Sequence, residues 1–230
     1  MTGMKREIST AKMLGLLVCG VVGCILMGGG DWLMIYGDTA YKGSLAWLTQ
    51  GVSQIAPWRN GLAMLLAFPA VILYGIALLG IGAFYKNDVC RRRYLFLTAA
   101  GMTPWLCLHL FYIMILYLFA WMHSAGHEAL AYEACEALFG QFVWLIPVAQ
   151  VIMLVPFFYW FGTVVSGKTV LPRAMAVNNP LLIYVVLKMV TMFLPDTGAR
   201  LAFVNGLMSE SMIVFFLILA AARSHLKSAG

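Results

Sequence analysis

The stretch MLGLLVCGVVGCILMGGGDWLMIY, residues 13–36, decides the fold, because its only charged side chain is Asp31. At about 1.5 Å of rise per residue, a helix of this length can cross the ~30 Å hydrocarbon core of a bilayer. A short basic segment with Lys5, Arg6 and Lys12 precedes it. The run is too long for the apolar part of a signal peptide and lacks a small-x-small cleavage site. We therefore predict a retained transmembrane helix.

Apolar runs of this kind recur along the whole chain. Of its 230 residues, 63% are hydrophobic and 10% are charged, whereas about 25% are charged in an ordinary soluble domain. We predict an all-α integral membrane protein, with one transmembrane domain over residues 1–230 and a bundle of about six helices. The expected spans are 13–36, 61–85, 94–122, 135–162, 181–194 and 201–222, of which the fifth is the shortest.

Positive side chains are distributed unevenly between the predicted connections. Eleven lie in the N-terminal arm, the second and fourth connections and the C-terminal tail. Only Lys42, Arg59 and Arg200 lie in the other connections, and Lys188 lies within a span. Because cytoplasmic loops carry the excess of Lys and Arg, we predict that both termini are cytoplasmic, in a cytoplasmic or plasma membrane. The formal charge of +6 thus reflects orientation, and we expect no nucleic-acid partner.

A short helix on the outer membrane surface is expected between the first two spans. Leu45, Leu48, Val52 and Ile55 recur at helical spacing, and Pro57 ends the pattern. Such an amphipathic segment is typical of an interfacial helix. An irregular loop with incidental spacing remains the alternative.

Five ionisable side chains fall inside the predicted spans: Asp31, His109, Glu136, Lys188 and Glu210. Such a group costs about 2.5–3.5 kcal/mol at the membrane centre on insertion scales, so it is expected to face the bundle interior and to have a partner. Counting the helical rise from the outer boundary places four of them within roughly 15 Å of that boundary and His109 near mid-membrane. We therefore predict a polar cavity in the outer half.

On a helix, Asp31 shares a face with Gly20, Gly23, Cys24 and Gly28. Small residues allow a neighbouring helix to approach closely and bury the carboxylate. The three glycines that precede it, residues 28–30, can instead loosen the helix, as in transporters whose unwound backbone coordinates ions. Both readings remain open.

Lys188 lies on one face with Tyr184 and Thr191, so we expect it inside the bundle, in an ion pair with Asp31 or Glu210. His109 shares a face with Trp105 and Tyr112, which suits a flat apolar ligand, although a backbone carbonyl can equally satisfy a lone histidine. The candidate catalytic residues are Asp31, His109 and Glu210. The candidate substrate-binding residues are Trp105, Tyr112, Tyr184, Lys188, Asn205 and Ser209.

No cofactor is clearly encoded, since the chain has no P-loop, dinucleotide fingerprint, GxSxG elbow or CxxCH site. The weak candidates for a metal site are His123 and His127, an HxxxH pair. Gly126 interrupts this pair, and the pair lies in an outer loop, so we do not assign a metal site to it.

Three functions fit these observations. The first is an intramembrane enzyme or a binder of a lipid-like amphiphilic substrate in the outer-half cavity. The second is a small ion- or proton-coupled transporter or channel. The third is a non-catalytic accessory subunit whose buried charges only specify helix pairing. Membrane lipids and an amphiphilic small molecule or ion are the expected partners. The sequence decides neither enzymatic activity nor oligomeric state.

Overall fold

The computed structural model describes residues 9–36 and 51–229, and these form a helical bundle. No strand occurs in these ranges, where the only β-type pairing is an isolated bridge between Tyr85 and Thr169. The prediction of an all-α fold is therefore confirmed. The α-helices are α1 (Thr10–Ile35), α3 (Pro57–Gly80), α4 (Asp88–Ser124), α5 (Glu128–Phe142), α6 (Leu145–Val165), α7 (Pro180–Thr191) and α8 (Gly198–Ala222). The 3-10 helices are η1 (Val52–Gln54), η2 (Ile81–Phe84), η3 (Arg173–Val177) and η4 (Arg223–Ala229).

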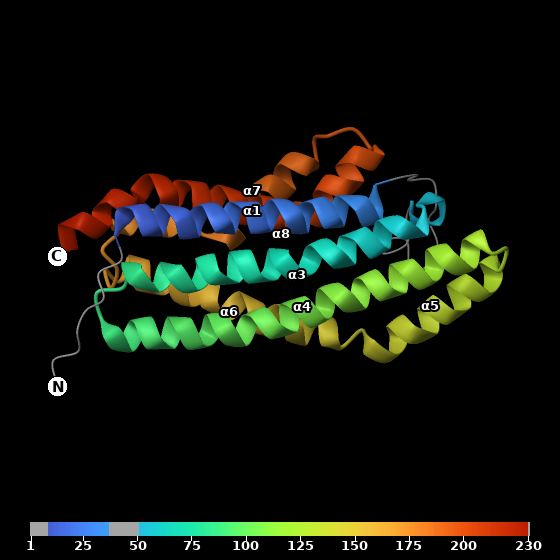
Figure 1. Ribbon diagram of the computed structural model, residues 1–230, viewed down its shortest axis with the longest axis horizontal. Helices are drawn as coiled ribbons and strands as arrows, with labels where there is room; N and C mark the ends of the chain where they lie inside the picture. Colours follow the sequence, from blue (N-terminus) through green and yellow to red (C-terminus); the bar gives the residue numbers. More distant parts are fainter. Residues whose placement is uncertain (1–8, 37–50, 230) are drawn as a thin grey trace.

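The helices run along one long axis (Figure 1). The start of α1 lies beside η4 at one end, which we call the terminal end. The turn between α4 and α5 lies at the other end, the hairpin end, and projects beyond the end of α1 (Figure 1). Within the described ranges, five helices, namely α1, α3, α4, α6 and α8, are long and apolar enough to cross a membrane. These helices support a multipass membrane protein.

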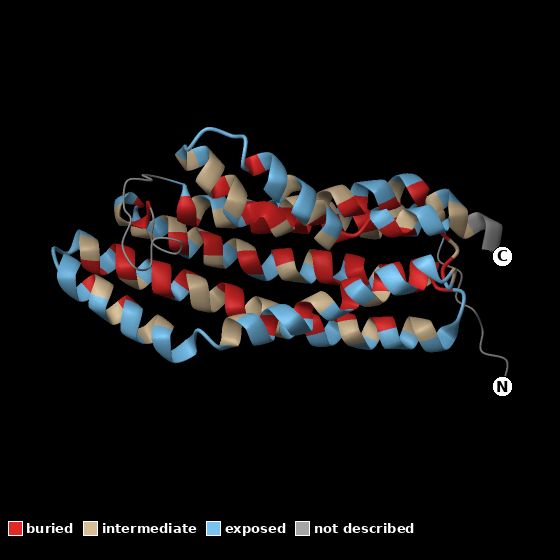
Figure 2. Cartoon of the chain, turned by 180° about the vertical axis from the view of Figure 1, so that it is seen from behind, coloured by how far each residue is buried: buried red, intermediate tan, exposed pale blue. Residues whose placement is uncertain are grey.

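The outside of the bundle is apolar, as expected for a surface that meets lipid. Buried residues gather where the helices face one another, and exposed residues lie on the outer sides (Figure 2). Among the exposed side chains are Leu65, Phe96, Phe158 and Phe193, each from a different part of the chain. Monomeric soluble proteins rarely expose large apolar patches. A bilayer is therefore the solvent that suits this surface.

Glycines bring α1 close to its neighbours α3 and α8. A Cβ atom added to Gly23 would lie 2.7 Å from the backbone nitrogen of Tyr74 in α3. One added to Gly28 would lie 3.2 Å from Cβ of Ser209 in α8. The close-packing interpretation of this glycine face is thus confirmed. The alternative of a loosened helix is wrong, because α1 continues without a break through residues 28–30.

The predicted fourth span, 135–162, differs from the structure. A turn at Val143 and Trp144 separates α5 from α6, so this segment belongs to two helices. Because α6 begins at Leu145, Pro147 lies in its first turn, where the missing N–H is tolerated, rather than in a helix interior. The predicted fifth span corresponds to α7, which has 12 residues. At about 18 Å, α7 is shorter than a bilayer core, so the count of six spans stays a prediction.

Most of the predicted interfacial helix lies outside the described residues. Its last part is η1, which contacts α4. Val52 within η1 is fully buried, and Ile55 directly after it is almost fully buried.

Two apolar cores divide the bundle along its axis. The terminal-end core contains Phe84, Trp160 and Phe215. The hairpin-end core contains Ile113 and Phe119 with residues from the end of α1 and from α5. The region between these cores holds the candidate site.

Candidate functional site

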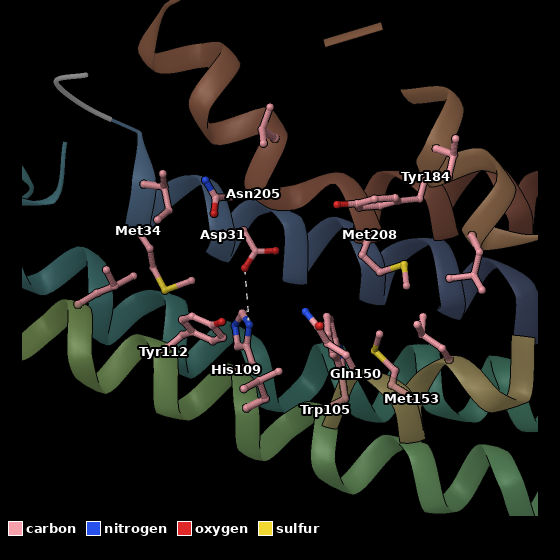
Figure 3. Close-up of a pocket in the computed structure, with 17 residues that line it drawn as sticks. Asp31, Met34, Trp105, His109, Tyr112, Gln150, Met153, Tyr184, Asn205 and Met208 are labelled. Atoms are coloured by element: carbon pink, nitrogen blue, oxygen red, sulfur yellow. Dashed lines mark ion pairs between the residues drawn. The ribbon is translucent and has the colours of Figure 1, made fainter. Parts of the chain in front are cut away.

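A cavity of about 650 Å³ lies between the two cores. Five helices, α1, α4, α6, α7 and α8, contribute to its wall, and the side chains labelled in Figure 3 come from all five. Most of the lining is apolar, with a few polar groups among it. The lining residues are Asp31, Met34 and Ile35 from α1; Trp105, Leu108, His109, Tyr112 and Leu116 from α4; Gln150, Met153 and Leu154 from α6; Leu181, Tyr184 and Val185 from α7; and Val204, Asn205 and Met208 from α8.

The polar centre of the cavity is the pair formed by Asp31 of α1 and His109 of α4, which is an ion pair when the imidazole is protonated. The distance from Nδ1 of His109 to Oδ1 of Asp31 is 3.6 Å, and the two side chains are 9% and 16% exposed. Figure 3 shows them pointing toward each other across the cavity. The expected ion pair of Lys188 with Asp31 is therefore wrong, and His109 of α4 lies beside Asp31 instead.

The predicted face of α4 is the one that lines the cavity. Trp105, His109 and Tyr112 lie there together, one turn apart. Asp31 reaches them because the glycines of α1 fix that helix closely against α3 and α8. The structure thus brings together two of the three candidate catalytic residues with four candidate binding residues, counting Tyr184 and Asn205.

Glu210, the third candidate catalytic residue, is not part of the lining. Nε1 of Trp32 donates a hydrogen bond of 3.1 Å to its Oε1. The carboxylate lies over two glycines, since Oε1 is 2.5 Å from the Cβ position of Gly206 and 3.8 Å from that of Gly28. Its Oε2 is buried without a hydrogen-bond partner among the described residues. Glu210 therefore sits next to the cavity, in the α1–α8 contact, and shares an electrostatic interaction with Asp31.

The two remaining candidates on α8, Asn205 and Ser209, lie in different environments. Asn205 lines the cavity rim and donates a hydrogen bond of 2.9 Å to the carbonyl of Leu201 within its own helix. Ser209 is buried against Gly28 and does not line the cavity.

Lys188 does not lie inside the bundle as expected. It is exposed in the last turn of α7, and no ion pair to it occurs in the described part of the chain. Tyr184, one turn earlier on the same face, lines the cavity. Because α7 is short, Lys188 lies near its end, where a long side chain can reach water. Glu136 is also exposed, on α5.

The cavity is open at its side and bordered by packed aromatic rings toward the terminal end. Gln150 of α6 and Val185 of α7 line it and are themselves exposed. These two helices meet at few points, because α7 packs mainly on α8. Toward the terminal end, α6 and α8 lead to Trp160 and Phe215, whose ring centroids are 6.0 Å apart and which are almost fully buried. The open side therefore faces the surface that meets lipid.

Sequence reasoning missed the contribution of α6. Gln150, Met153 and Leu154 recur at i, i+3 and i+4, the spacing of one helical face. A glutamine in an otherwise apolar run was the signal that could have identified this face.

The chemistry available to this arrangement is binding and proton transfer. With Nδ1 of His109 toward the carboxylate, its Nε2 is the other nitrogen able to exchange a proton, and it is buried without a hydrogen-bond partner among the described residues. No serine, threonine, cysteine or lysine occurs among the described lining residues.

The described residues contain no group of three or more His, Cys, Asp or Glu side chains suited to a metal ion. The HxxxH pair, His123 and His127, therefore does not form a metal centre with other ligands among these residues. The α4 helix ends at Ser124, and Gly126 has a positive φ of 82°, so the two histidines are not on one helix. His123 instead lies 3.6 Å from the carboxylate of Glu128.

Comparison with known proteins places the chain in a family. No curated protein and no solved structure matches it. A family model matches residues 4–224, which is nearly the whole chain and includes all five cavity-lining helices. The chain belongs to the family described as a family of unknown function, DUF6796.

Proposed function

We propose that this protein is a membrane-embedded binding protein for a lipid-like amphiphile, and that Asp31 and His109 hold the polar part of that molecule. The observation that carries the proposal is a lateral cavity with one buried ion pair among mostly apolar side chains. Its volume of about 650 Å³ falls in the range of small-molecule sites. A purely water-soluble ligand would gain little from such a wall.

The arrangement of the lining suggests how the amphiphile lies. Its polar end would meet the carboxylate and imidazole, and its apolar part would contact Met34, Leu116 and Met208. Entry would occur from the bilayer between α6 and α7, past Gln150 and Val185, since these helices scarcely touch. This route avoids moving the apolar part through water.

The uneven distribution of positive residues supports an orientation with the terminal end in the cytoplasm. The cavity then opens to the outer half of the membrane, away from the basic loops. Under this orientation, the amphiphile comes from the outer leaflet of a cytoplasmic or plasma membrane.

The same ion pair supports an enzymatic version of this function. A histidine oriented by a carboxylate can accept a proton from a bound hydroxyl or return one to a leaving group. In that version His109 is the acid or base and Asp31 positions it. Binding is the step that both versions share.

Proton-coupled transport is the second candidate, and one observation favours it. Asp31, His109 and Glu210 are titratable groups on three different helices that meet beside one cavity. The packed rings of Trp160 and Phe215 argue against an open path to the terminal end. A proton flux in proteoliposomes that Asp31→Asn abolishes would favour transport over binding alone.

The binding proposal is tested by filling the cavity. Met208→Trp adds bulk to the lining, whereas Met192→Trp makes the same change at an exposed position beyond α7. Protein released from its own membranes is analysed by native mass spectrometry for retained amphiphiles. We expect Met208→Trp to lose the bound mass and Met192→Trp to retain it.

The polar half of the proposal has a separate readout. Asp31→Asn keeps the shape of the side chain and removes its charge. The dissociation constant of the bound amphiphile should therefore rise at least tenfold, which corresponds to about 1.4 kcal/mol of binding free energy. Equal retention by the wild type, Met208→Trp and Asp31→Asn would contradict the proposal.

A further inference from the structure

Two turns are joined at the terminal end of the bundle. One connects α3 to α4 through η2, and the other follows α6. The backbone nitrogen of Lys86 donates to the carbonyl of Lys168 at 3.0 Å, and that of Val170 donates to Phe84 at 2.9 Å. The bridge between Tyr85 and Thr169 lies between these bonds. The two turns are therefore held in a fixed relation.

This joint brings positive side chains together. Nζ of Lys86 donates to the carbonyl of Gly167 at 3.2 Å. The guanidinium of Arg173 approaches the same glycine, with Nε 3.6 Å from its Cβ position. Lys168 follows directly and is exposed. Three cations from two connections thus surround one turn.

The first turns of α4 add three more cations. Arg91 packs its Cγ 3.7 Å from the Cβ position of Gly82, which places it beside η2. We call the whole set the basic turn cluster: Lys86, Arg91, Arg92, Arg93, Lys168 and Arg173. Within the described ranges, none of its members forms an ion pair with a carboxylate. Asp88, in the first turn of α4, is the one carboxylate within residues 86–93 and 163–180, so these segments keep a net charge of +5 that is available to an external anion.

An apolar face begins where the basic turn cluster ends. On α6, Phe158, Phe161 and Val165 are exposed and recur at i, i+3 and i+7, so they form one stripe that runs toward Lys168. A ligand that follows this surface meets positive charge first and apolar side chains next. A phospholipid has this order of chemistry, and a soluble polyanion does not.

We propose that the basic turn cluster binds the phosphate headgroup of an anionic phospholipid, whose acyl chains lie along the Phe158–Phe161–Val165 stripe of α6. Basic groups at the membrane boundary attract anionic headgroups by about 1 kcal/mol each, which is about a fivefold change in affinity. This site lies at the opposite end of the cavity-lining helices from the ion pair and is independent of the function proposed above.

The test compares two lysine variants in the full-length protein. Lys168→Gln removes a cation from the cluster, and Lys188→Gln removes a cation from α7 that is also exposed. Binding of dioleoyl phosphatidylglycerol and dioleoyl phosphatidylcholine is measured by native mass spectrometry in detergent. We expect the wild type to prefer phosphatidylglycerol, Lys168→Gln to bind it about fivefold more weakly, and Lys188→Gln to match the wild type.

Thermal unfolding in the same detergent checks that the variants are folded. If Lys168→Gln unfolds, the wild type still tests the proposal, because rising salt must weaken binding of phosphatidylglycerol and leave that of phosphatidylcholine unchanged. Equal affinity for the two lipids, equal losses in the two variants, or full displacement of the lipid by millimolar inorganic phosphate would overturn it.

Discussion

The contact between α1 and α3 leads to a sharp prediction about Gly23. A Cβ atom at this position would lie 2.7 Å from the backbone nitrogen of Tyr74 and 2.8 Å from the carbonyl oxygen of Ala70. Both are backbone atoms, so no side-chain rotation relieves the clash. Gly23→Ala therefore requires the two helices to move apart.

The size of the effect follows from these distances. Ordinary contacts of a Cβ atom begin at 3.4 Å, so the two backbones must separate by about 0.7 Å. Overpacking of this kind costs about 1–3 kcal/mol, and a rigid backbone contact belongs at the upper end. Alanine is also the better helix former, by about 1 kcal/mol in water. That gain would partly conceal the steric cost if Gly23→Ala were measured alone.

Gly29 provides the matched control, because it lies on the same helix and a Cβ there meets nothing within 4 Å. Both variants share the gain in helix propensity, so their difference isolates the clash. We expect Gly23→Ala to unfold more easily than Gly29→Ala by about 3 kcal/mol in reversible denaturation in micelles, followed by tryptophan fluorescence. Equal stability of the two proteins would refute the close approach of α1 and α3.

Two further stability changes follow from single side chains. Lys188→Met should leave the free energy of unfolding within about 0.5 kcal/mol of the wild type, because the lysine is exposed and forms no ion pair in the described residues. A loss of several kcal/mol in the same denaturation assay would instead reveal a buried partner. Asn179→Ala should cost about 2 kcal/mol, since its side chain donates to the carbonyl of Phe157 at 2.8 Å and caps α7 through the nitrogen of Leu181. Asn205→Ala, which loses only a bond within its own helix, is the control, and equal losses in the two asparagine variants would contradict this role.

The helices and the faces that meet inside the bundle could be predicted because they depend on local sequence. Long apolar runs can satisfy their backbone in a bilayer only as helices, so residues 13–36 predicted α1 closely. The spacing of Trp105, His109 and Tyr112 likewise fixed which side of α4 faces the interior. Periodicity shows that a face is buried, but it does not show which neighbour covers it.

The cavity itself depends on the length of α7, which hydropathy does not explain. The α7 helix has 12 residues and packs along α8, so it does not close the space beside α6. Lys188 was expected inside because it shares a helical face with Tyr184. Tyr184 does line the cavity, but Lys188 lies one turn farther along, in the last turn of α7, and is exposed. The position at which a helix ends depends on a few residues, and α7 ends at the turn after Thr191.

The pairing of Asp31 with His109 was missed because depth was counted from the outer ends of the helices. From His109 to the end of α4 at Ser124 is about 22 Å, whereas from Asp31 to the end of α1 at Ile35 is about 6 Å. The ion pair nevertheless puts both side chains at one level, so α4 must extend about 16 Å farther than α1. The same projection carries Glu136 on α5, which is why this carboxylate is exposed and needs no partner in the bundle. One long hairpin thus accounts for the misplaced histidine, the exposed glutamate and the division of the predicted fourth span into two helices.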